Sequence, residues 1–387
     1  MPKRTGGLFG LTVSDENGVA AVYDMLKGKR SRAAYGKITI SNRKEIKRII
    51  LKRLTASAKR GNVAYYRTHA EEIGRKVAAE LREGRWVPRP YREKLTYDGL
   101  RGKLRRIKVP CLHDQVAHHA IMRVTAPHIL RRNDWHNCGS IPKAGQTRAT
   151  RIVKRWMARP KPPRYALTMD VRKFYDSCPH VTVMAALRRI IKDKQLLGLH
   201  EIVLGSMGDG LAIGFYPSQW YANLVLYAVD RMLASTPGVD FVRYADDITV
   251  CAHNKRLLHR LRKQTSQLLL SIGLQLKRTW QVYPIARRGI AFLSYRFFAQ
   301  YTVIRKGLLK RISRTMRSAG RNLTPHVAMA VESYMGIMMQ CNCYRFKLKY
   351  VYPYITQRKI KEVIRYVENL CRVQRAALAI RGAARGE

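Results

Sequence analysis

The sequence predicts an α+β protein in which short apolar strands alternate with amphipathic and buried helices. Two strand patterns lead to this expectation. One apolar run, 165–169, leads directly into Asp170. Further along, two β-prone arms within 240–252 flank the adjacent acids Asp246 and Asp247. Between these patterns, a largely apolar helix is expected over 218–233, and its lack of a polar face predicts that it is buried.

The composition points to a folded protein that binds a polyanion. The chain has 387 residues, with 75 Lys and Arg against 25 Asp and Glu, for a formal net charge of +50. Its hydrophobic fraction of 46% is enough for a real core and argues against a disordered basic tail. A charge so far from zero favours nucleic acid as the partner, with an anionic membrane surface as the weaker alternative.

Membrane insertion and secretion are not expected. No run of 18 apolar residues occurs, and no apolar segment follows the basic start of the chain. The seven cysteines are odd in number and form no CxxC pair, which favours free thiols over a disulfide framework or a zinc site. These features predict a protein of the reducing cytoplasm.

The first half of the chain is predicted to contain basic helices and one basic hairpin. Apolar residues recur at helical spacing over 42–60 and 69–83 on a Lys/Arg background. Residues 94–110 have a Gly-marked turn between two β-prone arms and are expected to form a hairpin. Helices are expected over 114–124 and 147–157, with a loop rich in Asn, Gly and Pro between them.

The acidic residues are the most specific feature. Placing two adjacent carboxylates between apolar strands costs repulsion and desolvation, which a bound divalent cation would offset. A plain polar hairpin tip is the alternative, because Asp is a common turn residue. Asp170 favours the cation: the order strand-Asp, helix, Gly loop, long helix, strand-Asp-Asp-strand is that of a polymerase palm. Two cations there could activate a primer 3′-hydroxyl and stabilise leaving pyrophosphate.

At these residues the chain resembles the reverse transcriptases. Tyr244-Ala-Asp-Asp247 is similar to the family's YxDD box, and 167–175 resembles its first palm motif. The resemblance implies that Asp170, Asp246 and Asp247 hold two Mg²⁺ ions, with Mn²⁺ as an alternative, and that the Val171 carbonyl is a further ligand. Tyr175 falls where the family keeps the aromatic side chain that excludes a ribose 2′-hydroxyl. A tyrosine that merely packs under the sheet is the alternative.

Other segments extend the resemblance over about 85–320. The strand at 103–108 looks like the fingers strand that grips the triphosphate, with Arg105 as first choice and Lys103 and Arg106 as alternates. Lys277 falls where the family has a proposed general acid for pyrophosphate, although it could be an ordinary surface lysine. The segment 289–298 resembles the primer grip, with its central residues Phe292, Leu293, Ser294 and Tyr295.

The resemblance implies a right-hand polymerase with fingers, a ferredoxin-like palm sheet and a helical thumb, plus a basic helical N-terminal extension. We expect the extension over 1–85, the fingers over 86–163, the palm over 164–300 and the thumb with C-terminal helices over 301–387. No Cys/His endonuclease module or ribonuclease H carboxylate cluster is recognisable after the thumb helix. The charge outside the cleft suggests a second RNA surface within 1–85.

The Gly-rich segment suggests a subgroup. Ile213, Gly214 and Gln219 form an IGxxxSQ pattern that resembles the reverse transcriptases of diversity-generating retroelements, which copy a template RNA with adenine-directed errors. Tyr216 and Pro217 depart from the usual Leu-Thr of that pattern. Defence-associated reverse transcriptases, which copy a dedicated noncoding RNA against phage, are the first alternative. Retrons and intron enzymes are others, and so is a non-catalytic RNA-binding protein with a polymerase palm.

The expected partners follow from this resemblance. They are a structured template or noncoding RNA, a primer–template duplex, dNTPs and, in the retroelement class, a small basic accessory protein. No membrane partner is expected. The resemblance implies a bacterial or phage-encoded cytoplasmic protein.

Overall fold

The computed structural model describes residues 4–27, 63–98, 103–362 and 365. The helix predicted over 42–60 therefore lies outside the described residues. The chain divides into two compact units. The first comprises Met1–Met25, Ala70–Ile290 and Phe297–Gln300, and the second comprises Leu26–His69, Ala291–Arg296 and Tyr301–Glu387.

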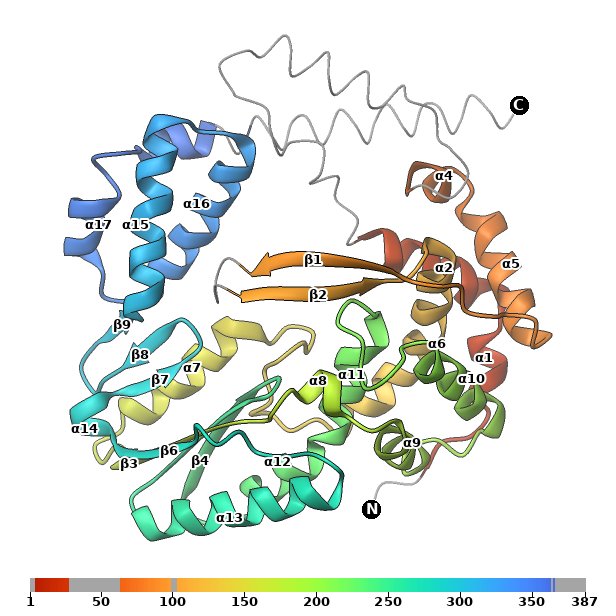
Figure 1. Ribbon diagram of the computed structural model, residues 1–387, viewed down its shortest axis with the longest axis horizontal. Helices are drawn as coiled ribbons and strands as arrows, with labels where there is room; N and C mark the ends of the chain where they lie inside the picture. Colours follow the sequence, from red (N-terminus) through yellow and green to blue (C-terminus); the bar gives the residue numbers. More distant parts are fainter. Residues whose placement is uncertain (1–3, 28–62, 99–102, 363–364, 366–387) are drawn as a thin grey trace. The chain divides into compact units, whose positions relative to one another are not determined.

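A four-stranded antiparallel sheet forms the centre of the first unit (Figure 1). Its strands lie in the order β4-β5-β3-β6. Helices connect β3 to β4 and β5 to β6, while β4 and β5 form a hairpin, so the topology is βαββαβ. This confirms the predicted α+β class and the ferredoxin-like sheet. The strand bounds are β3 Tyr165–Asp170, β4 Val239–Tyr244, β5 Asp247–Ala252 and β6 Gln281–Pro284.

Helices cover this sheet because its strands are apolar on both faces. Leu167 and Ala166 of β3 are fully buried although they point to opposite sides of the sheet. Helices α12 and α13 pack beneath the sheet in the view of Figure 1. The helices from the end of β3 to the start of β6 are α8 Phe174–Ser177, α9 His180–Arg188, α10 Lys194–Gly205, α11 Tyr216–Val225, α12 Tyr227–Ala234 and α13 Lys255–Ser271.

The N-terminal part of the first unit contains helices and the predicted hairpin. Strands β1 (Arg92–Asp98) and β2 (Lys103–Val109) pair antiparallel, which confirms the hairpin expected over 94–110. The residues at its tip lie outside the described part. The remaining elements of this unit are α1 Leu8–Thr12, α2 Asp15–Lys27, α5 Ala70–Arg82, α6 Leu112–Leu130, α7 Gly145–Met157 and α14 Ile285–Arg288. Helix α2 belongs to this unit as far as Met25.

The long helix predicted over 218–233 is instead two helices. Helix α11 ends at Val225, Leu226 forms a turn, and α12 begins at Tyr227. Apolar residues continue through the junction, and Leu226 itself is fully buried. Hydrophobic periodicity therefore detects the burial but not the break, because an apolar turn and an apolar helix have the same pattern.

One ion pair lies inside the core beneath the sheet. Arg243 of β4 and Asp230 of α12 form a forked pair, with Nε and Nη2 donating to the two carboxylate oxygens at 2.7 and 2.6 Å. Both side chains are 1% exposed. Removing one partner of such a buried pair costs about 3–5 kcal/mol, because the other charge is left unpaired. The pair therefore locks α12 to β4.

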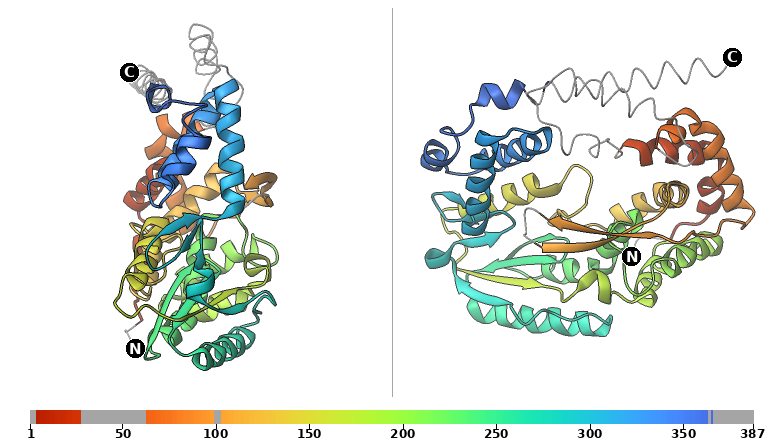
Figure 2. Two further views of the ribbon diagram at one scale, coloured as in Figure 1. Left: turned by 90° about the vertical axis from the view of Figure 1, so that its left-hand side faces the viewer. Right: turned by 45° about the horizontal axis from the view of Figure 1, so that its top comes forward.

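The second unit contains a small sheet and the helices α15, α16 and α17, which Figure 2 shows next to one another. Strand Thr302–Ile304 (β9) pairs with the hairpin of β7 (Ile290–Phe292) and β8 (Tyr295–Phe297). Helix α15, Lys306–Arg321, lies where the sequence predicts helices, over 301–387. It packs against α16 (Pro325–Met338) and α17 (Tyr344–Tyr350). Helix α4, Val63–Thr68, belongs to the same unit.

None of the described helices is both long enough and apolar enough to cross a bilayer.

Two glycines allow α2 and α5 to pack with their backbones in contact. A Cβ on Gly74 would lie 2.4 Å from the Cα of Val19, and one on Gly18 would lie 2.2 Å from the Gly74 carbonyl oxygen. Both distances are far inside van der Waals contact. The two helices would have to separate to accommodate a side chain at either position.

We predict that Gly74→Ala lowers the free energy of unfolding by about 1–3 kcal/mol, because the added methyl overpacks this contact. Gly198→Ala is the matched control: it also lies within a helix, but a Cβ there meets nothing within 4 Å. Its expected effect is a gain of about 0.5–1 kcal/mol. Urea unfolding measures both variants. Equal stability changes in the two would contradict the packing argument.

Candidate active site

The acidic hairpin ends in a two-residue loop. Tyr244 of β4 pairs with Asp247 of β5, so the loop residues are Ala245 and Asp246. Asp247 is thus the first residue of β5, whereas the sequence pattern had suggested Asp246 and Asp247 as the turn. Ala245 has φ 56° and Asp246 does not have positive φ, which is the pattern of a type II′ turn.

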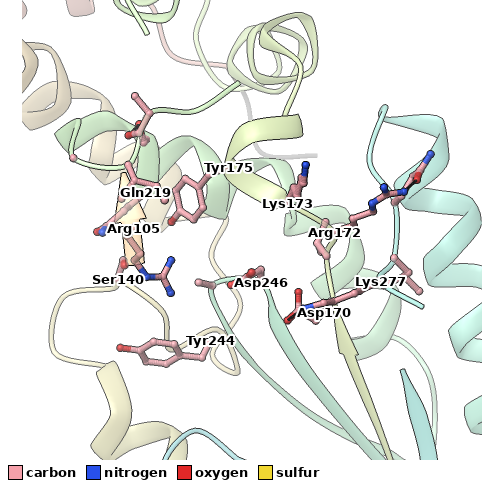
Figure 3. Close-up of a pocket in the computed structure, with 18 of the residues that line it drawn as sticks. Arg105, Ser140, Asp170, Arg172, Lys173, Tyr175, Gln219, Tyr244, Asp246 and Lys277 are labelled. Carbon is pink, nitrogen blue, oxygen red and sulfur yellow. Dashed lines mark hydrogen bonds and ion pairs between the residues drawn. The ribbon is translucent and has the colours of Figure 1, made fainter. Parts of the chain in front are cut away.

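The pairing of β3 with β5 places the third acid beside this loop. Asp170, the last residue of β3, lies directly opposite Asp247 in the antiparallel register. Asp170 and Asp246 both line one cavity of about 1090 Å³. Figure 3 shows these two carboxylates near each other at the ends of their strands. The sheet therefore brings together acids that are 76 positions apart in the sequence.

The cavity collects most of the residues expected from the sequence. Arg105, Tyr175 and Gln219 lie on one side of Asp246 in Figure 3, and Lys277 lies on the other. The predicted residues that line the cavity are Arg105, Asp170, Val171, Tyr175, Ile213, Gly214, Gln219, Asp246 and Lys277.

Other predicted residues do not line this cavity. Asp247 is not among the lining residues, although it pairs with Asp170 in the strand register. Arg106 forms an exposed ion pair with Glu93 of β1, at 3.6 Å. The backbone of Lys103 pairs with Asp98, but its side chain lies outside the described part.

The predicted primer-grip hairpin belongs mainly to the second unit. Leu293 and Ser294 form the turn between β7 and β8, and Leu293 has φ 51°. The Ser294 carbonyl accepts a hydrogen bond from the Arg305 amide at 3.0 Å. The Tyr295 hydroxyl donates to the Ile337 carbonyl at 3.0 Å, and Phe292 is buried. This hairpin is therefore fastened to the helices of its own unit.

Two hydrogen bonds from Lys108 to backbone carbonyls hold the Gly-rich segment in the cavity wall. The Lys108 amide donates to the Ile213 carbonyl at 2.8 Å, and Lys108 Nζ donates to the Met207 carbonyl at 2.6 Å. Gly214 has φ 114°, and a Cβ there would lie 2.2 Å from the Lys108 carbonyl oxygen. A glycine is therefore required where the hairpin β1–β2 meets this segment.

Tyr175 is held near the acids by its backbone and by packing. Its carbonyl accepts from the Leu211 amide at 2.6 Å. Burial, together with the nearby charge of Asp246, raises the pKa of the phenol to about 12. The phenol is therefore neutral at any pH near 7, and it presents bulk and a hydroxyl rather than charge.

A lysine lies against the first acid. The Lys277 amide donates to the Asp170 carbonyl at 2.8 Å, and its Nζ lies 3.5 Å from the Asp170 carboxylate. Both side chains are partly exposed, at 42% and 33%. The Lys277 ammonium is thus a direct neighbour of the first acid.

The sequence did not single out several cavity residues. Arg172 and Lys173 follow Asp170 and lie on the same side of the cavity as Lys277 (Figure 3). Ser140, which has φ 56°, and Tyr244 line the opposite side. Arg172 and Lys173 could have been found from their position within the motif at 167–175. No local signal marks Ser140, because the loop that carries it reaches the cavity only through tertiary contacts.

The donor set of the cavity fits a magnesium ion that is shared with a polyphosphate. Within the described ranges, no three His, Cys, Asp or Glu side chains gather closely enough to enclose an ion. Two carboxylates nevertheless face the same open space. Mg²⁺ commonly takes one or two protein carboxylates and completes its shell with waters and substrate phosphates. The Lys and Arg side chains around the cavity could bind the same phosphates by donating hydrogen bonds to their oxygens.

Several known proteins are similar to this chain. Protein YkfC of Escherichia coli (strain K12) is 23% identical over 291 residues, which is 63% of this chain and 75% of YkfC. Among solved structures, apo telomerase from Candida tropicalis matches with 11% identity and a TM-score of 0.45, over 79% of this chain and 71% of that chain.

A telomerase from Candida albicans, in complex with a TWJ fragment of telomeric RNA, matches with 12% identity and a TM-score of 0.42. That match covers 76% of this chain, which spans only 59% of the telomerase chain. A family model described as "Reverse transcriptase (RNA-dependent DNA polymerase)" matches residues 93–297, more than half of the chain. The protein belongs to the reverse transcriptase family and is an RNA-directed DNA polymerase.

Proposed function

We propose that this polymerase copies a cognate structured RNA into cDNA with errors at template adenines, as in a diversity-generating retroelement. The observation that carries the proposal is that Asp170 and Asp246 line the same cavity as Ile213 and Gly214. The acids support polymerisation, and the IG pair supports the error-prone subclass.

Asp170 and Asp246 are the proposed carboxylate ligands of two Mg²⁺ ions, with Mn²⁺ as an alternative. Asp247 and the Val171 carbonyl are further candidates, since both adjoin the cavity acids in the sequence. When bound, such ions stabilise the charge that develops on the attacking and leaving oxygens of an in-line displacement. The protein's own part is to hold the two carboxylates side by side on rigid strand ends.

The cations have separate proposed roles. Arg105 holds the incoming triphosphate, since its guanidinium can bind phosphate oxygens in a fork; Lys103 and Arg106 remain alternates. Lys277 lies beside Asp170, where it can protonate pyrophosphate as it leaves. Phe292, Leu293, Ser294 and Tyr295 are proposed to position the primer end.

Tyr175 is proposed to select deoxynucleotides. Its ring lies near both Asp246 and Arg105, whose charges shift the pKa of its hydroxyl in opposite directions. A ring at this place, held from behind by the loop at Leu211, occupies the volume that a ribose 2′-hydroxyl would need.

Ile213 is the proposed cause of low fidelity. Its carbonyl is held by Lys108, so its apolar side chain is presented from a fixed backbone. A polar side chain there could donate a hydrogen bond to the templating pair and penalise mispairs, whereas an isoleucine cannot.

The alternative role is defence against phage, in which the same cavity copies a dedicated noncoding RNA. A non-catalytic RNA-binding protein is the alternative from another class, and the intact pair of cavity acids disfavours it. The proposed partners are a structured RNA, a primer–template duplex, dNTPs and a small basic accessory protein. The proposed location is the cytoplasm, for a protein that is bacterial or phage-encoded. The proposed fingers, palm and thumb are 86–163, 164–300 and 301–387, following a basic extension over 1–85. Phage challenge of cells with and without the gene separates defence from diversification.

We predict that Asp246→Asn abolishes DNA synthesis, with kcat falling at least about 10³-fold, because one of two facing carboxylates loses its charge. Purified protein is supplied with primed RNA, its native RNA, dNTPs and Mg²⁺, and incorporation is measured. Asp240→Asn in β4, the strand that leads into this loop, is the control, because Asp240 pairs with Arg159 at the surface. DNA synthesis that survives Asp246→Asn would overturn the assigned centre.

We predict that Tyr175→Val raises the efficiency of rNTP use relative to dNTP use by about 10- to 100-fold, since a steric barrier to the 2′-hydroxyl is removed. The ratio of kcat/KM values for dCTP and CTP on one primed template measures this. Tyr216→Val is a matched control, because Tyr216 stacks on His119 and does not line the cavity. An unchanged ratio would mean that Tyr175 is a packing residue.

We predict that Ile213→Gln lowers misincorporation opposite adenine by about tenfold, because the new amide can hydrogen-bond the templating pair. Sequencing of cDNA made on an adenine-rich RNA template measures the errors, with errors opposite the other bases as the internal control. If error rates at adenine are the same in both proteins, the retroelement assignment loses its support while the polymerase assignment stands.

A further inference from the structure

A buried arginine reaches the peptide that precedes the cavity acid Asp246. Arg243 uses Nε and Nη2 for its fork with Asp230, which leaves Nη1 for other acceptors. Nη1 donates to Asn223 Oδ1 at 3.2 Å and to the carbonyl oxygen of Ala245 at 3.0 Å. Four of the five guanidinium donors are therefore used, and one of them holds the Ala245–Asp246 peptide plane.

That peptide needs an external restraint. Ala245 has φ 56°, in the left-handed region where a Cβ is disfavoured and where the first residue of a type II′ loop is usually glycine. Strained backbone persists only where surrounding contacts over-determine it. The hydrogen bond from Arg243 is one such contact, and it acts on the residue that carries the strain.

The loop at 136–140 restrains the turn from its other side. The Arg243 amide donates to the His136 carbonyl at 2.9 Å, and the Cys138 amide donates to the Arg243 carbonyl at 2.8 Å. Gly139 lies so close to the turn that a Cβ on it would come 2.2 Å from the Ala245 nitrogen. The hairpin edge and this loop are therefore joined directly.

Asn223 ties these contacts into one network. Its Oδ1 accepts from Arg243 and from Asn137 Nδ2, and its Nδ2 donates to the Gly139 carbonyl at 2.9 Å. The next residue of the loop, Ser140, lines the cavity. The network thus links one wall of the cavity to the turn that carries Asp246.

We propose that Arg243 is a positioning residue for catalysis: anchored by Asp230 and Asn223, it fixes the strained Ala245–Asp246 peptide and so sets where the Asp246 carboxylate stands relative to Asp170. A lysine keeps the charge, but its single ammonium cannot hold Asp230 in a fork and reach the turn as well. The inference rests on polymerase activity at this site, so extension by the wild-type protein is measured first.

The test compares Arg243→Lys in two backgrounds. In the native background we expect kcat to fall roughly 10- to 100-fold while KM for dNTP changes less than about threefold, since the acid is displaced but the nucleotide pocket is kept. In the Ala245→Gly background the positive φ carries no steric cost, so the same substitution should lower kcat by less than about threefold. The melting temperature of every variant reports on folding.

Two further variants keep the test decisive. Asp230→Glu moves the carboxylate that anchors Arg243 without removing its charge, and it replaces Arg243→Lys in the test if that variant does not fold. We expect the same fall in kcat in the native background and the same smaller fall in the Ala245→Gly background. Arg159→Lys is the control, because this arginine pairs with Asp240 on the same strand at the surface. A positioning role is excluded if folded Arg243→Lys keeps wild-type kcat, or loses equally in both backgrounds. An inactive wild-type protein would instead count against the proposed function.

Discussion

The antiparallel register between β3 and β5 is the constraint on which the site depends. It sets Asp170 opposite Asp247 and therefore one residue from the loop that carries Asp246. A slip of one residue would turn the side chains of β3 to the other face and remove Asp170 from the cavity. Such a slip would also break the pairing of the buried residues Leu167 with Val250 and Met169 with Ile248.

Charge is distributed unevenly around the cavity that this register creates. The chain carries +50, yet the cavity is centred on two carboxylates with cations on both sides. Such an arrangement attracts polyanions to the cavity mouth, and in the proposed function it leaves the acids to bind the hard cations that accompany a triphosphate. Lys277 partly neutralises Asp170 from the side, so the two acids can approach each other in the folded protein at a lower electrostatic cost.

The sequence predicted the main strands and hairpins because their patterns are local. Residues 165–170 and 240–252 were recognised from apolar runs next to acids, and the cavity residues Arg105, Tyr175 and Gly214 from motifs around them. The loop register could not be read, since alternation does not reveal which two residues of Ala245, Asp246 and Asp247 form the turn. The break at Leu226 was hidden by continuous hydrophobicity.

The long-range polar contacts could not be predicted from the sequence, for a different reason. Arg243 sits in an apolar strand of a protein with 75 basic residues, and its partner Asp230 lies in a helix before that strand. Neither residue carries a pattern that marks it as buried. The same holds for Asn223 and for the loop at Ser140, which reach the cavity only through the assembled fold.

The enclosed arginine also limits how this site can change over evolutionary time. Asn223, Asp230 and Arg243 satisfy one another in a space closed to water, so replacing one alone leaves an unpaired charge or amide in the core. An apolar substitute becomes acceptable only when its partners change with it. The outer cations of the cavity, which contact solvent, have no such dependence. Nucleotide and template preferences can therefore drift by single substitutions, while the turn beneath them is inherited as a unit.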